Sequence, residues 1–263
     1  MARYQLTLAY DGTDFFGSQR QAKRRTVQGE LEKALCKLGW TGRSVIMAGR
    51  TDTGVHATGQ VAACDLDWSH SDDDLARALN ASLPADIAVH QARMAHAKFH
   101  PRFDALSRRY RYKLFCQSLR DPLRERFVWR VWPPVSGDAL ATAATLFLGT
   151  HDFSTFGSPT TPRGGTVRTV TKAEWSQALD GEDGLWHFEV QADAFLYRMV
   201  RRLVFVQVAV AQGKVSADVI AHSLAKQLPA GMRSETLFPA GLAPAHGLTL
   251  VEVAYAKQES IGQ

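Results

Sequence analysis

Apolar side chains recur at every second position over residues 3–10, from Tyr4 to Tyr10. This period predicts a half-buried strand that ends at the turn formed by Asp11 and Gly12. After residue 26 the apolar positions take helical spacing instead. We therefore expect a helix with Thr26 as its N-cap and with Gly39 just beyond its end.

The remaining pattern divides the chain into two series of similar elements. The first series continues with strands at 44–48, 59–66 and 87–94 and a helix from Ser71 to Leu83, which Pro84 ends. The second series has a strand carrying Tyr110, Tyr112 and Leu114, further strands near 167–175, 186–192 and 248–255, and helices near 137–148, 195–212 and 216–227. This order predicts an α+β fold of two similar halves, residues 1–104 and 105–263. We expect each half to be a largely antiparallel sheet backed by helices, with the active cleft between them.

Two stretches between these elements, 149–166 and 229–247, are rich in Gly, Pro, Ser and Thr. Such composition predicts irregular connections. Connections of this length are more often functional than idle, so both stretches are candidates to contribute to a site.

Composition is that of a folded globular protein. Hydrophobic residues make up 45% and charged residues 22% of the chain, which argues against disordered and collagen-like classes. The first residues lack the basic start and apolar run of a secretory signal. The longest apolar run, Leu203 to Ala211, is far shorter than the roughly 20 residues that cross a bilayer. We therefore expect a cytoplasmic protein without a membrane span.

The three cysteines, Cys36, Cys64 and Cys116, are widely spaced and form no C-x-x-C pair. No histidine accompanies them at the spacing of metal ligands. We therefore expect reduced thiols, each most simply a small buried hydrophobic side chain, in a protein that holds no metal.

Positive charge is concentrated in clusters rich in arginine. The net charge is +5 and the isoelectric point is near 9.2, which favours an anionic partner. The clusters are Arg20 with Lys23, Arg24 and Arg25; Arg108, Arg109, Arg111 and Lys113; Arg120, Arg124, Arg126 and Arg130; and Arg198, Arg201 and Arg202. Guanidinium groups match phosphate oxygens in pairs, so the clusters are candidates for nucleic-acid contacts. Each cluster could equally be a solvated face.

The stretch from Gly49 to His56, GRTDTGVH, is the best candidate for a catalytic loop. Its glycines give the backbone freedom, and in an extended segment Arg50 and Asp52 would point to the same side. A carboxylate placed there can act as a nucleophile without a metal or cofactor. From the residues alone, the simpler interpretation is a polar turn in which Asp52 caps backbone amides, because turns use aspartate heavily.

Other catalytic schemes lack their parts in this sequence. It contains no phosphate-binding G-x-x-x-x-G-K-[ST] loop, no G-x-G-x-x-G, no H-E-x-x-H and no G-x-S-x-G. His56 and His100 each stand alone, so structural hydrogen bonding is the better interpretation of both than metal ligation.

Several motifs together resemble those of the tRNA pseudouridine synthase A family. The stretch GRTDTGVHATGQV at 49–61 is the most specific of them, and the resemblance extends over nearly the whole chain. The other segments are YDGTDFFGSQRQ at 10–21, TVQGELEKAL at 26–35, FHPRFDALSRRYRY at 99–112, HDFSTF at 151–156, AFLYRMVRRLV at 194–204 and APAHGLTLVEVAY at 243–255.

The resemblance implies an isomerase that converts uridine to pseudouridine at positions 38, 39 and 40, in the anticodon stem-loop of tRNA. It implies no cofactor and no metal, a homodimer, and the two-half α+β fold. Matched residue by residue, Asp52 would be the nucleophile, Tyr110 would stack on the target base and Arg201 would pair with Asp52. An arginine partner would keep Asp52 ionised away from water.

The remaining expected contacts follow from charge and position. On the strand, alternation would put Tyr110 and Tyr112 on one face and Arg109 and Arg111 on the other, with Tyr112 in the core. Arg198 is expected to share one helix face with Arg201 and Arg202. The residues expected to contact the RNA, besides Tyr110, are Arg50, His56, Gln19, Arg20, Arg24, Arg25 and Arg198.

The sequence departs from the family pattern at Ser18, where the family usually has Trp, at Thr53, where Ala is usual, and at Ala209, where Gly is common. The first departure could change packing or an RNA contact beside Gln19. Two other functions stay open: a non-catalytic RNA-binding protein on the same scaffold, and a synthase that acts on another RNA. The presence of Asp52 and Arg201 speaks against loss of catalysis.

Overall fold

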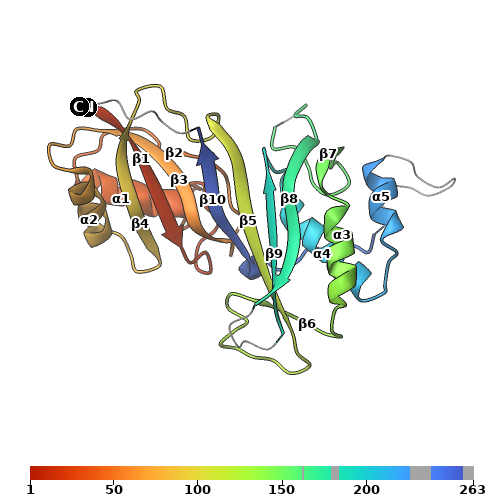
Figure 1. Ribbon diagram of the computed structural model, residues 1–263. Coiled ribbons are helices and arrows are strands. Elements are labelled where there is room, and N and C mark those ends of the chain that lie inside the picture. Colours follow the sequence, from red (N-terminus) through yellow and green to blue (C-terminus); the bar gives the residue numbers. More distant parts are fainter. Residues whose placement is uncertain (162, 179–183, 226–237, 257–263) are drawn as a thin grey trace. The chain divides into compact units, whose positions relative to one another are not determined.

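The computed structural model describes residues 1–161, 163–178, 184–225 and 238–256 (Figure 1). The chain forms two compact units. The first contains Met1–Arg108 and the described residues from Leu250 onward, and the second contains Arg109–Thr249. The predicted domain limits, 1–104 and 105–263, stay a prediction. The chain enters the second unit at Arg109 and returns to the first at Leu250.

The first unit is a largely antiparallel sheet packed against two helices. Its strands run in the order β4-β1-β3-β10, and β2 pairs with β3. Their bounds are β1 (Ala2–Tyr10), β2 (Ile46–Met47), β3 (His56–Leu66), β4 (Ile87–Ala95) and β10 (Leu248–Tyr255), with helices α1 (Val27–Lys37) and α2 (Asp72–Ser82). β1 pairs antiparallel with both β3 and β4.

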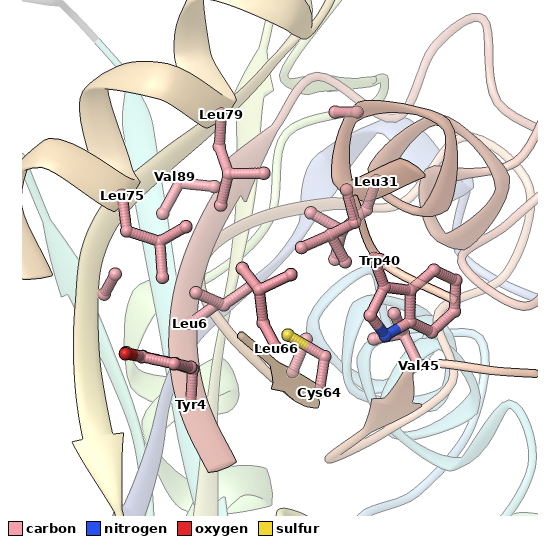
Figure 2. Packing of buried hydrophobic residues seen from close by; sticks show 14 of the residues in the cluster. Tyr4, Leu6, Leu31, Trp40, Val45, Cys64, Leu66, Leu75, Leu79 and Val89 are labelled. Carbon is pink, nitrogen blue, oxygen red and sulfur yellow. The ribbon is translucent and has the colours of Figure 1, made fainter. Parts of the chain in front are cut away.

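The core of this unit joins the sheet to both helices. Figure 2 shows Leu31 of α1 and Leu75 and Leu79 of α2 grouped around Leu6 of β1, with Trp40 closing one side. Burial of such side chains stabilises the fold by about 1.5–3 kcal/mol each. The alternation expected along residues 3–10 is therefore confirmed, because its apolar face is the one covered by the helices.

Both helices of the first unit begin at the expected caps. The Thr26 hydroxyl accepts a hydrogen bond from Gly29 N at 3.3 Å, and Ser71 forms a capping box with Asp74. Gly39 follows α1 with φ +86°, a conformation that glycine adopts without strain.

The expected strand at 44–48 is shorter than predicted, because side chains of α1 bond the backbone at its start. Gln28 donates to Val45 O at 3.1 Å, and Val45 N donates to Glu32 at 3.0 Å. These bonds take the place of ladder bonds at Val45, so β2 begins at Ile46. Beyond Met47, Ala48 N still donates to Val61 O of β3 at 2.8 Å.

The second unit repeats the combination of sheet and helices. Its strands run in the order β5-β9-β8-β7, and β6 pairs parallel to β5. Their bounds are β5 (Ala105–Cys116), β6 (Trp129–Val131), β7 (Gly149–Asp152), β8 (Val167–Gln177) and β9 (Leu185–Ala192), with helices α3 (Gly137–Thr145), α4 (Met199–Ala211) and α5 (Asp218–Leu224) and a 3-10 turn at Ala245–Gly247. The predicted α+β class with largely antiparallel strands is confirmed.

One expectation in the second unit needs correction, and two others lie partly outside the described residues. The stretch 149–166 is not wholly irregular, because Gly149–Asp152 pairs with β8. Of the stretch 229–247, residues 229–237 lie outside the described residues, as do residues 226 and 227 of the predicted helix at 216–227.

In the parts of the chain that the structure describes, no helix is long and apolar enough to cross a membrane.

Candidate active site

Asp52 lies in a tight turn between β2 and β3. Val55 N donates to Asp52 O at 3.1 Å, and Gly54, the third residue of this turn, has φ +79°. A type II turn requires that conformation at its third position. The Asp52 side chain is half-buried, while Arg50 and Thr53 on either side are exposed. The expected turn is therefore present and leaves Asp52 half-buried, whereas capping of backbone amides by the Asp52 side chain stays a prediction.

Thr51, the residue before Asp52, is bonded on three sides. Its N–H donates to the Ser18 hydroxyl at 2.8 Å, and its carbonyl accepts from Ser18 N at 3.1 Å. Its hydroxyl lies 2.9 Å from the Tyr10 hydroxyl. Tyr10 is buried, and its burial raises its pKa to about 12. Ser18, the departure from the family pattern, therefore acts here through internal packing and hydrogen bonding.

Gln60 supports the same turn from β3. Its amide nitrogen donates to Gly49 O at 3.0 Å and lies 3.4 Å from the Tyr10 hydroxyl. Sequence reasoning did not single out Tyr10 or Gln60 as site residues. The available signal was that each belongs to a segment that resembles a family motif.

His56 has the structural role expected of it. Its Nδ1 accepts a hydrogen bond from Gly12 N at 2.9 Å and lies 3.2 Å from Asp11 Oδ1. The side chain is buried, so it joins the start of β3 to the turn that follows β1. Direct contact of His56 with RNA stays a prediction.

The basic cluster after Ser18 contains two kinds of arginine. Arg25 forms two hydrogen bonds of 2.6 and 2.7 Å to Asp86, and Arg20 bonds Glu32 at 2.7 Å. Arg24 is exposed and covers the Phe16 ring at 4.4 Å. Gln19 is also exposed.

Tyr110 and Tyr112 of β5 both point into the second unit. Tyr112 is 0% exposed and donates to Pro244 O at 2.8 Å, which confirms it as a core residue. Burial raises the pKa of Tyr112 well above its usual value. Tyr110 is 9% exposed and packs edge-to-face against Phe195, with ring centroids 5.1 Å apart.

The arginines beside Tyr110 lie on the opposite face of β5, as expected from alternation. Arg109 contacts Glu189 of β9 at 3.4 Å, and Arg111 donates to the same carboxylate at 3.0 Å through Nε. Lys172 bonds Glu189 at 2.8 Å. Burial alone would raise the pKa of Glu189, but Lys172 and Arg111 lower it to about 2.

Arg201 is oriented by the chain segment before β10. Its Nε donates to Ala243 O at 2.8 Å, and Ala243 N donates to Arg201 O at 3.2 Å. Burial lowers the pKa of the neighbouring His246, Glu125 opposes this shift, and the Arg201 charge adds to it. Arg201 belongs to the second unit and Asp52 to the first, and their pairing stays a prediction.

The prediction that Arg198 lies on the helix with Arg201 is wrong. Arg198 precedes α4 and has φ +62°, so it is the residue at which the chain turns into the helix. Tyr197 exchanges backbone hydrogen bonds with Ser158, and this bridge keeps Tyr197 out of the helix. The guanidinium of Arg198 lies 4.7 Å from the Tyr197 ring centroid.

We predict that Glu189→Gln destabilises the second unit by about 2 kcal/mol, because it leaves three cations around a neutral amide. Ionised Glu189 contributes stability above its unfolded pKa. In the wild type this contribution should be lost as the pH falls from 4.5 toward 2. Urea unfolding across this range measures the effect.

Glu174→Gln, at an exposed partner of the same Lys172, is the control and should change stability by less than about 0.5 kcal/mol. Equal effects of the two variants would contradict the role of Glu189.

Comparison with known proteins identifies the family. Residues 7–104 and 143–256 match the family model described as tRNA pseudouridine synthase. These ranges contain Asp52 and Arg201, whereas Tyr110 falls between them.

Three relatives, each named tRNA pseudouridine synthase A, match nearly the whole chain. The Chloroflexus aurantiacus protein is 40% identical over 258 residues, which cover 97% of this chain and 89% of that protein. The protein of Geobacillus sp. WCH70 is 40% identical over 96% of this chain and 98% of its own length. The Solidesulfovibrio magneticus protein is 42% identical over 97% of this chain and 92% of its own length. The chain therefore belongs to the tRNA pseudouridine synthase family.

Proposed function

We propose that this protein isomerises uridine to pseudouridine at positions 38, 39 and 40 in the anticodon stem-loop of tRNA. The reaction breaks the bond from ribose C1′ to uracil N1 and joins C1′ to C5. C5 gives up its hydrogen as a proton and N1 takes up a proton, so the composition of the nucleotide is unchanged. Such a reaction requires a nucleophile and a confining pocket. The observation that carries the proposal is the half-buried Asp52 on a turn whose preceding residue, Thr51, is bonded on three sides.

In this proposal Asp52 is the nucleophile and Arg201 its partner. Attack by Asp52 on the base, attack on the sugar, and elimination assisted by Asp52 as a base all require an ionised carboxylate. Removal from water favours the neutral acid, and a nearby guanidinium favours the charged form. The orientation of Arg201 Nε by Ala243 O supports a fixed rather than a freely moving cation.

Tyr110 is proposed to stack on the target base after that base leaves its helix. Extrusion of a base costs a few kcal/mol, which stacking on an aromatic ring partly offsets. A stacking ring must be held in place. Phe195 packs against Tyr110. Arg109 and Arg111, the residues before and after Tyr110, both pair with Glu189 and so fix the strand next to the ring.

The remaining proposed RNA contacts lie on both units. They are Arg50, His56, Gln19, Arg20, Arg24 and Arg198. Arg25, which the sequence also made a candidate, is instead proposed to hold its loop through Asp86. Arginine contacts with phosphates supply affinity and register rather than sequence information. Exposure of Arg50, Gln19 and Arg24 supports direct contact by these three side chains.

We also propose that the protein works as a homodimer in the cytoplasm, and that the substrate is tRNA rather than another RNA. Mapping pseudouridines by carbodiimide footprinting in cells that lack the gene separates the alternatives. Loss at positions 38, 39 and 40 of tRNA supports the proposal. Loss in another RNA identifies a different substrate, and no loss identifies a non-catalytic binding protein.

We predict that Asp52→Ala and Asp52→Asn abolish tritium release from tRNA labelled at uridine C5, because both remove the carboxylate. RNA affinity and the midpoint of thermal unfolding should stay near the wild-type values. Asp14→Asn, at an exposed carboxylate of the same unit, is the control and should retain full activity. Substantial turnover by Asp52→Ala would rule out Asp52 as the nucleophile.

We predict that Tyr110→Ala lowers kcat by about 10- to 100-fold, which corresponds to loss of one stacking interaction of about 1–3 kcal/mol. Tyr110→Phe retains the ring and should remain within a few-fold of the wild type. Tyr112→Phe removes the hydrogen bond to Pro244 and should lower stability by about 1 kcal/mol while kcat is retained. Single-turnover kinetics and urea unfolding measure the two effects. Wild-type kcat in Tyr110→Ala would refute stacking.

We predict that Arg24→Ala and Arg25→Ala have different effects although the residues are adjacent. Loss of Arg24 should reduce by about 1 the slope of log affinity for tRNA against log salt, as expected for one phosphate contact. Loss of Arg25 should lower the free energy of unfolding by about 1 kcal/mol, because its guanidinium bonds Asp86. Salt titrations of tRNA binding and urea unfolding test this. An unchanged slope in Arg24→Ala would exclude the contact.

A further inference from the structure

Every polar group of Thr51, the residue that precedes the proposed nucleophile, has a hydrogen-bond partner within the protein. The N–H of Thr51 is bonded to the Ser18 hydroxyl, its carbonyl to Ser18 N, and its own hydroxyl to Tyr10. Ser18 is 0% exposed, Tyr10 5% and Thr51 7%. A buried hydrogen-bonding group that loses its partner costs about 1–3 kcal/mol. Other conformations of this residue are therefore disfavoured.

Gln60 extends this network. Its amide nitrogen donates to Gly49 O and toward the Tyr10 oxygen, and its own oxygen accepts from Val61 N at 3.2 Å. The Tyr10 hydroxyl therefore bonds both Gln60 and the Thr51 hydroxyl. The raised pKa of Tyr10, about 12, keeps this hydroxyl protonated at physiological pH.

Ser18 is in turn fixed on the start of α1. Gln28 N donates to Ser18 O at 2.9 Å, and Val27 N donates to Gly17 O at 3.4 Å. Gly17 has φ +80°, and a Cβ there would lie 2.7 Å from Thr51 O. Only glycine lets the backbone approach the turn this closely. This segment therefore holds the Ser18 hydroxyl in place next to Thr51 N.

We propose that Ser18, Tyr10 and Gln60 are positioning residues that hold Thr51, and through it the carboxylate of Asp52, in the reactive orientation. This inference rests on the proposed function of Asp52. A displacement of about 1 Å at a reacting group can cost on the order of 100-fold in rate. Ser18 has a role that the usual tryptophan could not fill, since an indole N–H donates but cannot accept from Thr51 N.

The test compares variants that each remove one buried hydroxyl: Ser18→Ala, Tyr10→Phe and Thr51→Val. Each should lower the single-turnover rate constant for tritium release by about tenfold while the Kd for tRNA changes by less than about twofold. Thr51→Ser keeps the hydroxyl that Tyr10 bonds and should restore most of the rate lost in Thr51→Val.

Ser71→Ala is the matched control for stability. It breaks the capping box of α2 in the same unit and should cost about 1 kcal/mol of folding free energy without changing the rate constant. Unfolding midpoints are measured for every variant, so that rates are compared at temperatures where all are folded.

The outcomes separate the two proposals. A wild type that releases no tritium from labelled tRNA overturns the proposed function, and the positioning role with it. An active wild type with unchanged rate constants in Ser18→Ala and Tyr10→Phe overturns the positioning role alone. So does a rate loss in Ser71→Ala as large as that in Ser18→Ala, because the loss would then follow general stability. A selective loss in the hydroxyl variants, restored in Thr51→Ser, supports the positioning role.

Discussion

The two hydrogen bonds between the backbone of Thr51 and Ser18 are the constraint on which the candidate site of the first unit depends. They join a turn that follows β2 to a loop that follows β1, and α1 holds that loop from the other side. Each bond contributes only about 1 kcal/mol net, but leaving either group buried without a partner would cost more. The bonds therefore act mainly by making one conformation of the Asp52 turn much better than its alternatives.

Much of the fold could be predicted because local signals agree with the tertiary structure. The apolar period along β1 and the caps at Thr26 and Ser71 all correspond to observed elements. Prediction failed where contacts with residues distant in sequence determine where a strand or helix begins. Bonds from Gln28 and Glu32 shorten β2, and local spacing cannot reveal them. The start of α4 was also predicted wrongly for this reason. The helical period of the sequence extends through residues 195–198, but the bridge between Tyr197 and Ser158 keeps that segment out of the helix.

The candidate site divides in the same way. The sequence of the 49–56 stretch indicated a turn, and the resemblance indicated its chemistry. The roles of Tyr10 and Gln60 could not be predicted, because a strand pattern marks both as ordinary positions of β1 and β3. Their functional meaning comes from contacts across 41 and 11 residues of sequence. Ser18 was visible as a departure from the family pattern, but whether it faced RNA or the protein interior depended on its burial.

The sequence shows where the arginines cluster, but only the structure shows which of them are paired with carboxylates. Arg25 is committed to Asp86, and Arg111 to Glu189, so part of each arginine cluster is balanced inside the protein. A one-to-one pair such as Arg25 with Asp86 adds little to long-range attraction, because it presents no net charge to a phosphate. Glu189 balances only one of its three cations, Arg109, Arg111 and Lys172. Arg24 and Arg50 are exposed instead. The net charge of +5 therefore indicates an anionic partner without indicating which arginines meet it. The ion pairs identify those that hold the strands and loops of each unit in place.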